Sequence, residues 1–386
     1  MDSKYFFPEW PQYDNDEKEG LIRALEQGQW WRVHGQETEL FEKEFAQHHG
    51  CEHALAVTNG THALELSLLT AGIKPGDEVI VPSFTFISTA MAVQRVGGTP
   101  VLADVDLDNY CLCPKATEQA ITDKTKAIIP VHMCGHFADM EAFNALAAKY
   151  DLTIIQDSAH AHGARGQQGR SSGEWGSMAC FSFQNFKLMT AGEGGLLLCP
   201  DQETFDRAYV YANCGRVMND KDYKHTVCGS NYRMGEFSAA VLRAQLSRLD
   251  SQTKAREANA KLMNQAFSDI PDLIIQGHQN MAQVHPHYMY MFRLNDDAME
   301  RIGRTRVVDK LVELGIPAYR AYKALHRVEA YWQGPHKGES ETDLAASLKN
   351  SDAISDCGVW LHHRVLLGNS NHVEFIADSL KTILKN

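Results

Sequence analysis

Cysteine is scarce and scattered in this chain of 386 residues. Its nine cysteines are an odd number, and only Cys111 and Cys113 lie close together in the sequence. No pair has C-x-x-C spacing, and no group of cysteines and histidines has the spacing of zinc ligands. We therefore expect free thiols in a reducing cytoplasm, without a disulfide framework and without a metal site.

Long apolar runs and an excess of basic residues are also missing. No run approaches the roughly 18 apolar residues that a membrane span needs, and the acidic, proline-broken N-terminus does not look like a signal peptide. The 37 basic and 49 acidic residues give a net charge of −12, which disfavours binding to nucleic acids and to anionic membranes. The sequence thus predicts a cytoplasmic protein with neither nucleic acid nor membrane as a partner.

The chain contains no internal repeat and no low-complexity tract. Its composition, 44% hydrophobic and 22% charged, is typical of a globular protein. At roughly 150 residues per domain, the length predicts about two domains. A chain of this size buries a large core without the help of disulfides or metals.

Short β-rich runs alternate with helical stretches between Leu55 and Cys199. The strand candidates share a continuous apolar character and are Glu78–Pro82, Pro100–Val105, Ala127–His132, Thr153–Asp157, Cys180–Phe183 and Leu196–Cys199. The helical stretches between them are Thr61–Ala71, Phe84–Val96 and Met140–Tyr150. Continuous apolar strands are typical of a sheet buried on both faces. The order predicts a mostly parallel α/β sheet with its sites at the carboxyl ends of the strands.

The pattern changes beyond this region. Apolar residues at helical spacing run from Phe237 to about Phe267. After them come a strand-like run at His287–Leu294, helices near Val307–Leu314 and Val373–Leu384, and a polar surface loop at Gln333–Thr342. This mixture predicts a large α/β domain with an N-terminal segment over residues 1–250, and a smaller C-terminal α+β domain over residues 251–386.

The strongest local signal for chemistry is Lys187. It ends the segment Ser182–Lys187, just past an apolar strand, and a glycine-rich turn, Thr190–Gly195, follows it. Lone lysines usually lie on the surface, but this one has apolar, tightly turning flanks. Desolvation lowers the pKa of a lysine towards a usable neutral amine, and such an amine suits Schiff-base chemistry.

Two further segments hold polar residues next to predicted strands. Thr58–His62 joins a strand-like run to an apolar helix, whose free N–H groups and dipole favour an anion, although such helix caps are common. Asp157 ends an apolar strand and is costly to bury unless a cation meets it. His160 and His162 follow it, but no third metal ligand lies nearby in the sequence, so a metal site is not predicted.

These segments together resemble the fold-type I enzymes of pyridoxal 5′-phosphate (PLP), in the branch of sugar and secondary-metabolite aminotransferases. The resemblance covers nearly the whole chain. It implies that Lys187 binds the cofactor as a Schiff base and then acts as acid and base. It implies that Asp157 faces the pyridine nitrogen, whose protonated form it favours by roughly 1–3 pKa units. Gly60, Thr61 and the Ser182 hydroxyl would hold the phosphate.

The same resemblance assigns three further residues to the site. Phe86 would stack on the cofactor ring, His160 would lie near the ring hydroxyl, and Asn231 would reach the phosphate from a neighbouring subunit. The last assignment implies a homodimer with shared active sites. Ordinary core packing for Phe86 and a turn position for Asn231 are the structural alternatives.

Six segments resemble a narrower group in this family, the 3-amino-5-hydroxybenzoate synthases. They are residues 8–13, 24–32, 55–64, 157–163, 187–195 and 359–367. This resemblance implies that a small-molecule substrate, 5-amino-5-deoxy-3-dehydroshikimate, undergoes PLP-assisted dehydration to the aromatic starter unit of ansamycin antibiotics. Two positions depart from the pattern: Phe186 stands where we expect a glycine, and His34 where we expect a small residue.

Three functions therefore compete at the level of sequence. We favour dehydration, because the match is close around His160, His162 and the His362–His363 pair. The second hypothesis is an aminotransferase that acts on a keto-sugar or ketocyclitol with glutamate or glutamine. The third is a catalytically idle protein of the PLP fold. Candidates for anchoring a substrate carboxylate or hydroxyls are Arg233, Tyr319, Arg320 and Tyr322.

Overall fold

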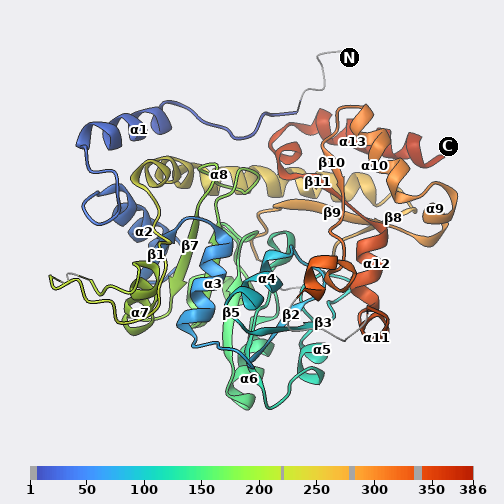
Figure 1. The fold of residues 1–386 in the computed structure, drawn as a ribbon. Coiled ribbons are helices and arrows are strands. Elements are labelled where there is room, and N and C mark those ends of the chain that lie inside the picture. Colours follow the sequence, from blue (N-terminus) through green and yellow to red (C-terminus); the bar gives the residue numbers. More distant parts are fainter. Residues whose placement is uncertain (1–6, 219–220, 278–282, 334–340, 386) are drawn as a thin grey trace.

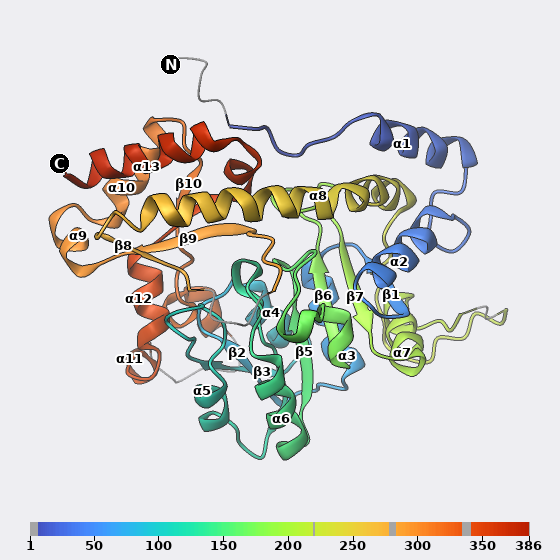
Figure 2. The same ribbon diagram turned by 180° about the vertical axis from the view of Figure 1, so that it is seen from behind.

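The computed structural model describes residues 7–218, 221–277, 283–333 and 341–385. Figures 1 and 2 show a large sheet with helices on both faces, a smaller sheet beside it, and the long helix α8 running across both. The helices are α1 (Asn15–Gln27), α2 (Glu37–His48), α3 (Gly60–Thr70), α4 (Ser88–Arg95), α5 (Pro114–Gln119), α6 (Met140–Tyr150), α7 (Gln202–Ala212), α8 (Glu236–Phe267), α9 (Asp296–Arg301), α10 (Arg304–Glu313), α11 (Glu341–Ala345), α12 (Lys349–Cys357) and α13 (Ser370–Lys385). The strands are β1 (His53–Val57), β2 (Glu78–Pro82), β3 (Thr99–Ala103), β4 (Thr125–Ile128), β5 (Thr153–Asp157), β6 (Met178–Ser182), β7 (Gly195–Cys199), β8 (Leu273–Ile275), β9 (Met289–Leu294), β10 (Ala318–Arg320) and β11 (Gly358–His362).

The larger sheet has seven strands in the order β1-β7-β6-β5-β4-β2-β3. Its neighbouring strands are parallel except around β7, which runs antiparallel to both β1 and β6. The predicted α/β class with a mostly parallel sheet is therefore confirmed. The predicted strands Glu78–Pro82 and Thr153–Asp157 have the bounds of β2 and β5.

Both faces of this sheet are buried, as its continuous apolar strands predict. Along β6, Ala179 and Phe181 enter a first core, which α2, α6 and the start of α8 cover. Cys180 points to the opposite face and enters a second core with residues of α3, α4 and α7. Alternate residues of one strand thus serve two cores, which is why the run shows no polar alternation.

The smaller sheet is antiparallel, in the order β10-β11-β9-β8. It packs with α10, α13 and the second half of α8 around a third core that includes Met263, Phe292 and Leu380. The predicted boundary at residue 250 falls inside α8, between the half that enters the first core and the half that enters the third. Phe7 lies in the predicted range 1–250 but packs into the third core. The division into 1–250 and 251–386 stays a prediction.

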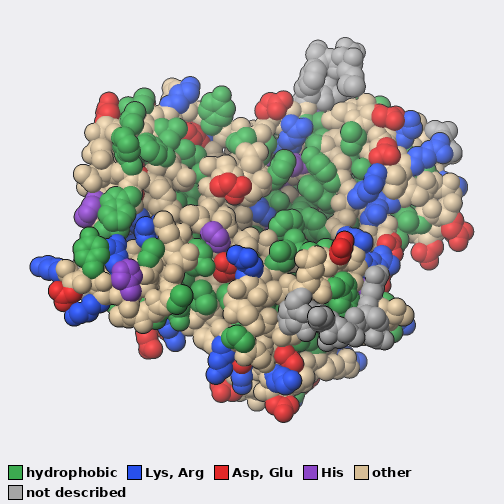
Figure 3. All heavy atoms as spheres, viewed as in Figure 1, with side chains coloured by type: hydrophobic (Ala, Val, Ile, Leu, Met, Phe, Trp, Pro, Cys, Tyr) green, Lys and Arg blue, Asp and Glu red, His purple; other side chains and the backbone are tan. Residues whose placement is uncertain are grey.

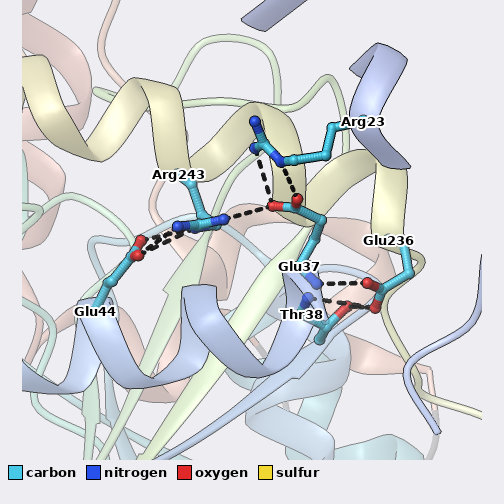
Figure 4. A network of polar contacts seen from close by, with 6 residues as sticks. All are labelled: Arg23, Glu37, Thr38, Glu44, Glu236 and Arg243. Carbon is cyan, nitrogen blue, oxygen red and sulfur yellow. Dashed lines mark hydrogen bonds and ion pairs between the residues drawn. The ribbon is translucent and has the colours of Figure 1, made fainter. Parts of the chain in front are cut away.

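The start of α8 also caps α2 (Figure 4). The residue before α2 makes no capping hydrogen bond with its own side chain. Instead the Glu236 carboxylate accepts hydrogen bonds from the backbone N–H groups of Glu37 (2.6 Å) and Thr38 (3.3 Å). A carboxylate is favoured there because the first N–H groups of a helix lack partners. Glu37 in turn pairs with Arg23 of α1 and Arg243 of α8, so three helices are tied together.

Most other predicted bounds differ from the structure, as for Ala127–His132 against β4 (Thr125–Ile128), and three of the differences have local reasons. The helix predicted at Phe84–Val96 begins only at Ser88, because the segment after β2 forms part of the cavity described below. The strand predicted at His287–Leu294 begins at Met289, because His287 has a left-handed backbone (φ 50°). Most of the predicted loop Gln333–Thr342 lies outside the described residues, and its last two residues belong to α11.

None of the helices in the described ranges combines the length and the apolar character that crossing a membrane requires.

Candidate active site

A cavity of about 650 Å³ opens where the carboxyl ends of the large sheet face the smaller sheet. Figure 3 shows a hollow in the middle of this face, with mostly hydrophobic side chains on its walls. The cavity brings together the predicted site residues other than Asn231, namely Gly60, Thr61, Phe86, Asp157, His160, Ser182 and Lys187. Asp157 and Ser182 are the last residues of β5 and β6. The cavity therefore lies at the carboxyl ends of the strands, where parallel sheets usually carry their sites.

Lys187 lies five residues past β6, on a tight turn that its backbone N–H closes by donating to the carbonyl of Gln184 (2.8 Å). Its Nζ lies 4.4 Å from the centre of the Tyr288 ring. Burial lowers the pKa of the Lys187 amine to about 8, and the charge of Asp157 offsets part of that shift. A neutral amine is therefore available near neutral pH, as a nucleophile or proton acceptor requires.

Asp157 lies on the floor of the cavity. Its Oδ2 accepts a hydrogen bond from the Thr89 hydroxyl (2.8 Å), and its Oδ1 accepts one from the backbone N–H of Ala159 (3.2 Å). Burial raises the pKa of the Asp157 carboxyl, and these hydrogen bonds and the charge of Lys187 oppose the rise. A cationic group in the cavity would stabilise the carboxylate further, and the carboxylate would stabilise that cation in return.

The start of α3 meets the end of β6 at one side of the cavity. Gly60 and Thr61 are the first residues of α3, whose N–H groups have no helical acceptor. Asn59 caps the helix by accepting from the N–H of His62 (2.8 Å), and the Thr61 hydroxyl donates to Ser88 (2.9 Å). A Cβ on Gly60 would lie 2.6 Å from the Cβ of Ser182. Only glycine allows this approach of helix and strand.

Aromatic rings form much of the remaining wall. His160 is buried and stacks on Tyr288, with ring centres 4.2 Å apart, and its Nδ1 accepts from the N–H of Cys134 (3.3 Å). Burial and the nearby charge of Lys187 hold the pKa of His160 well below its usual range, so the ring is neutral. Phe86 is 53% exposed although it lines the cavity. A large apolar side chain left open in this way is suited to cover a bound ligand.

These residues fit PLP in their chemistry. The unpaired N–H groups of Gly60 and Thr61 and the Ser182 hydroxyl are donors for a phosphate at a helix start. The buried Asp157 carboxylate suits a protonated ring nitrogen, and Lys187 supplies an amine of lowered pKa. Phe86 offers a ring face for stacking. Among the described residues, no group of three or more histidine, cysteine or acidic side chains has the arrangement of a metal site.

Some residues singled out in the sequence lie elsewhere. Asn231 is exposed and does not line the cavity of its own chain. Arg233 donates to Asn213 (2.9 Å), and Arg320 pairs with Asp309 on the surface (3.3 Å); neither arginine lines the cavity of its own chain. Of the four candidate anchors, Tyr319 and Tyr322 line it. His162 is buried among the rings of Phe181 and Phe183 instead.

Three residues that complete the site were not predicted from the sequence, and a fourth, Phe186, was noted only as a departure from the pattern. Thr89, whose hydroxyl donates to Asp157, lies in the first turn of α4, and no motif in the sequence marks it. Tyr288 and Trp360 come from the C-terminal part, more than 100 residues from Lys187. Phe186, the departure beside the lysine, is 47% exposed at the cavity, where its ring packs edge-on against His362 with centres 5.5 Å apart. Only the packing of distant segments brings Thr89, Tyr288 and Trp360 to Lys187.

Comparison with known proteins agrees with this geometry. The chain is 50% identical to 3-amino-5-hydroxybenzoate synthase of Amycolatopsis mediterranei over 380 residues, 97% of each chain. A crystal structure of 3-amino-5-hydroxybenzoic acid synthase matches with a TM-score of 0.95 and 49% identity, covering 99% of both chains. L-glutamine:2-deoxy-scyllo-inosose aminotransferase of Streptoalloteichus tenebrarius is 32% identical over 98% of this chain and 95% of its own length.

The sequence pattern of the DegT/DnrJ/EryC1/StrS aminotransferase family matches residues 12–381. The match includes both sheets and the whole cavity, and the predicted resemblance to this kind of enzyme is confirmed. The chain belongs to the DegT/DnrJ/EryC1/StrS aminotransferase family.

Proposed function

We propose that this protein is a PLP-dependent lyase that converts 5-amino-5-deoxy-3-dehydroshikimate into 3-amino-5-hydroxybenzoate, an antibiotic precursor, in the cytoplasm. The observation that carries the proposal is the 50% identity to a 3-amino-5-hydroxybenzoate synthase over 97% of the chain. The relatives that transfer an amino group from glutamine are less similar, at 32% identity. Free thiols at all nine cysteines agree with a reducing compartment.

The cofactor is PLP, and each part of it has a group in the cavity to hold it. Lys187 would bind it covalently, Asp157 would pair with the ring nitrogen, and His160 would lie by the ring hydroxyl. Gly60, Thr61 and Ser182 would hold the phosphate, and Phe86 would cover the ring. When bound, PLP withdraws electrons from the amine-bearing carbon of the substrate.

Lys187 has the central task in the reaction. Its amine, with a pKa of about 8 because of burial, takes the proton from the amine-bearing carbon of the substrate. The Asp157 carboxylate would favour the protonated form of the ring nitrogen of a bound cofactor. The ring hydroxyl next to that carbon then leaves and takes up the first proton as one water molecule, and a second proton moves from a ring carbon to the keto oxygen, which completes the aromatic ring. The net change is the loss of one H₂O, so the reaction needs neither an oxidant nor an amino donor, and the nitrogen stays on the ring.

The wall opposite Asp157 supports a small ring as substrate. Tyr319 and Trp360 are neighbours across β10 and β11 and stack with ring centres 4.3 Å apart and planes 19° apart. With Tyr322 they line the cavity, whose described lining contains no arginine and no lysine besides Lys187. Flat aromatic faces suit a ring that becomes planar, whereas the diphosphate of a nucleotide sugar calls for basic side chains.

Incubation with the substrate alone tests the proposed reaction. We expect aromatic absorbance to grow when 5-amino-5-deoxy-3-dehydroshikimate is supplied without glutamate or glutamine, because dehydration uses no amino donor. The matched reaction contains glutamine without the dehydroshikimate. Bleaching of the cofactor band by glutamine alone, with no aromatic product in the first reaction, would show that the protein is an aminotransferase like its 32% identical relative.

We also propose that the active unit is a homodimer with shared sites, in which Asn231 reaches the phosphate of the neighbouring copy. The exposed position of Asn231, outside the cavity of its own chain, supports this role. A patch of large apolar side chains is exposed around α1, where Figure 3 shows hydrophobic atoms gathered; it includes Ile22, Leu25 and Trp30, each at least 53% exposed. Such a patch is typical of a protein interface.

Co-expression of two inactive variants tests the shared site. A mixed dimer of Lys187→Ala and Asn231→Ala chains contains one site with both native residues and one with neither. We expect activity above the mean of the two pure variants, measured on differently tagged, doubly purified mixed dimers. A fully active monomer in analytical ultracentrifugation, or activity of the mixed dimer equal to that mean, would contradict shared sites.

A further inference from the structure

The N-terminal segment 7–13 passes directly over the turn that carries Lys187. Figures 1 and 2 show it running alongside α8, from the C-terminal part of the chain to α1. At one end, Phe7 enters the third core, and the backbone carbonyl of Pro8 accepts from Arg364 (3.3 Å). At the other end, the carbonyl of Gln12 accepts from Gln245 of α8 (2.9 Å). The segment is thus fixed at both ends.

Trp10 lies between these two anchors and contacts the lysine turn. Its indole N–H donates to the backbone carbonyl of Asn185, with 2.9 Å between nitrogen and oxygen. The same ring stands edge-on to His363, with ring centres 4.4 Å apart and planes 87° apart. Asn185 is two residues before Lys187, so this hydrogen bond joins the N-terminal segment to the backbone of the turn itself.

His363 holds the next carbonyl of the same turn. Its Nε2 lies 3.1 Å from the backbone oxygen of Phe186, and because a carbonyl only accepts, Nε2 must carry the hydrogen. The ring is fully buried. Burial and the neighbouring His362 and Arg256 hold the pKa of His363 well below its usual range, so the ring donates as a neutral imidazole.

The turn is therefore held at three consecutive carbonyls. Its own Lys187 N–H takes the carbonyl of Gln184, Trp10 takes that of Asn185, and His363 takes that of Phe186. Neither Trp10 nor His363 lines the cavity. A lysine side chain has a long flexible stem, so its amine is placed only as well as the backbone that carries it. Catalytic groups lose much of their effect when they are displaced by about 1 Å.

We infer that Trp10 and His363 are positioning residues, which fix the backbone carbonyls of Asn185 and Phe186 and thereby aim the Lys187 amine into the cavity. The inference depends on the proposed function only for what the Lys187 amine does in the reaction. It gives the N-terminal segment a part in the active site, although the segment is far from Lys187 in the sequence.

The test uses variants that remove one donor and keep a ring. Trp10→Phe and His363→Phe each lose an N–H, His363→Gln keeps a donor near the position of Nε2, and Trp332→Phe is the control. Trp332 likewise donates its indole N–H to a backbone carbonyl and does not line the cavity, but its acceptor, His326 (2.8 Å), is not part of the turn that carries Lys187. Circular dichroism and thermal unfolding first establish that each variant folds.

Two readouts then follow Lys187 without relying on turnover. In the cofactor-free protein, mass spectrometry measures how fast an amine-reactive reagent labels Lys187 at each pH. In a second arm, borohydride traps PLP that has become linked to Lys187. We expect Trp10→Phe and His363→Phe to capture PLP about five- to tenfold more slowly, as the loss of one positioning hydrogen bond implies. We also expect the pH dependence of the Lys187 labelling rate, the labelling profile, to shift to higher pH. His363→Gln and Trp332→Phe should resemble the native protein.

Folded Trp10→Phe and His363→Phe proteins with native labelling profiles and native capture rates would overturn the inference. So would an equal loss in Trp332→Phe, because the effect would then be a general one. The proposed function fails separately, if the native protein binds PLP on Lys187 and yields no aromatic product. If the native protein does not link PLP to Lys187, the labelling profiles still decide whether the two residues position the amine.

Discussion

Replacement of Lys187 by alanine is expected to lower the turnover of 5-amino-5-deoxy-3-dehydroshikimate by about 10⁴-fold or more, because one side chain serves both as the cofactor's covalent anchor and as the acid and base. Purified native protein should be yellow, and borohydride should abolish the colour while fixing the cofactor to the peptide that contains Lys187. The variant should bind PLP only reversibly. Small primary amines added to it should restore a fraction of the proton transfer.

The control for this experiment is Lys254→Ala, which removes an exposed lysine of α8. It should retain native activity and colour, so that a loss in Lys187→Ala cannot be assigned to charge alone. Trapping of PLP on the Lys187→Ala protein at a single other lysine would show that the anchor has been assigned to the wrong residue.

Asp157→Asn is expected to lower turnover by about 10- to 10³-fold, since a carboxylate raises the pKa of a neighbouring protonated nitrogen by roughly 1–3 units, at 1.36 kcal/mol per unit. The substitution keeps the shape of the side chain but removes its charge. Exchange of the proton on the amine-bearing carbon with solvent deuterium, followed by mass spectrometry, measures the affected step directly.

Stability separates this effect from damage to the fold. Burial raises the pKa of the Asp157 carboxyl. The charged carboxylate therefore lowers the stability of the folded protein when no cation of a bound cofactor faces it. The cofactor-free Asp157→Asn protein should therefore unfold at a temperature no lower than that of the native protein. Thr89→Val, which removes one hydrogen bond to the carboxylate, should cost about tenfold in turnover or less. Native deuterium exchange in Asp157→Asn would be incompatible with the proposed role.

Local sequence patterns were sufficient to predict the large sheet and the residues at its strand ends. The strands Glu78–Pro82 and Thr153–Asp157 could be predicted residue by residue, because each is a short apolar run between polar or turn-forming flanks. Asp157 and Lys187 then followed from where such strands end. Parallel sheets place their strand ends together, so knowing the strands was enough to place these two residues near each other.

Patterns of this kind could not predict the side of the cavity built by the C-terminal part. Tyr288 and Trp360 reach the site from segments that contact it only through tertiary packing, and a tyrosine or tryptophan has no positional signature in sequence. The same limit explains why Arg233 and Arg320 were considered as anchors. Their residue type suits a carboxylate, but their partners, Asn213 and Asp309, are set by the fold around them.

The long helix α8 has a consequence for how proteins of this architecture can change over time. Its first half supplies Leu242 and Leu249 to the first core, and its second half supplies Met263 and Phe267 to the third. Suppose that recombination exchanges the part of the gene on one side of α8 with that of a relative. If the junction lies before or after the helix, α8 has to pack against one core from the other protein. If the junction lies within the helix, its two halves come from different proteins. We therefore expect that the C-terminal part does not transfer as a module, and that new specificities in this scaffold arise by substitution within the cavity wall.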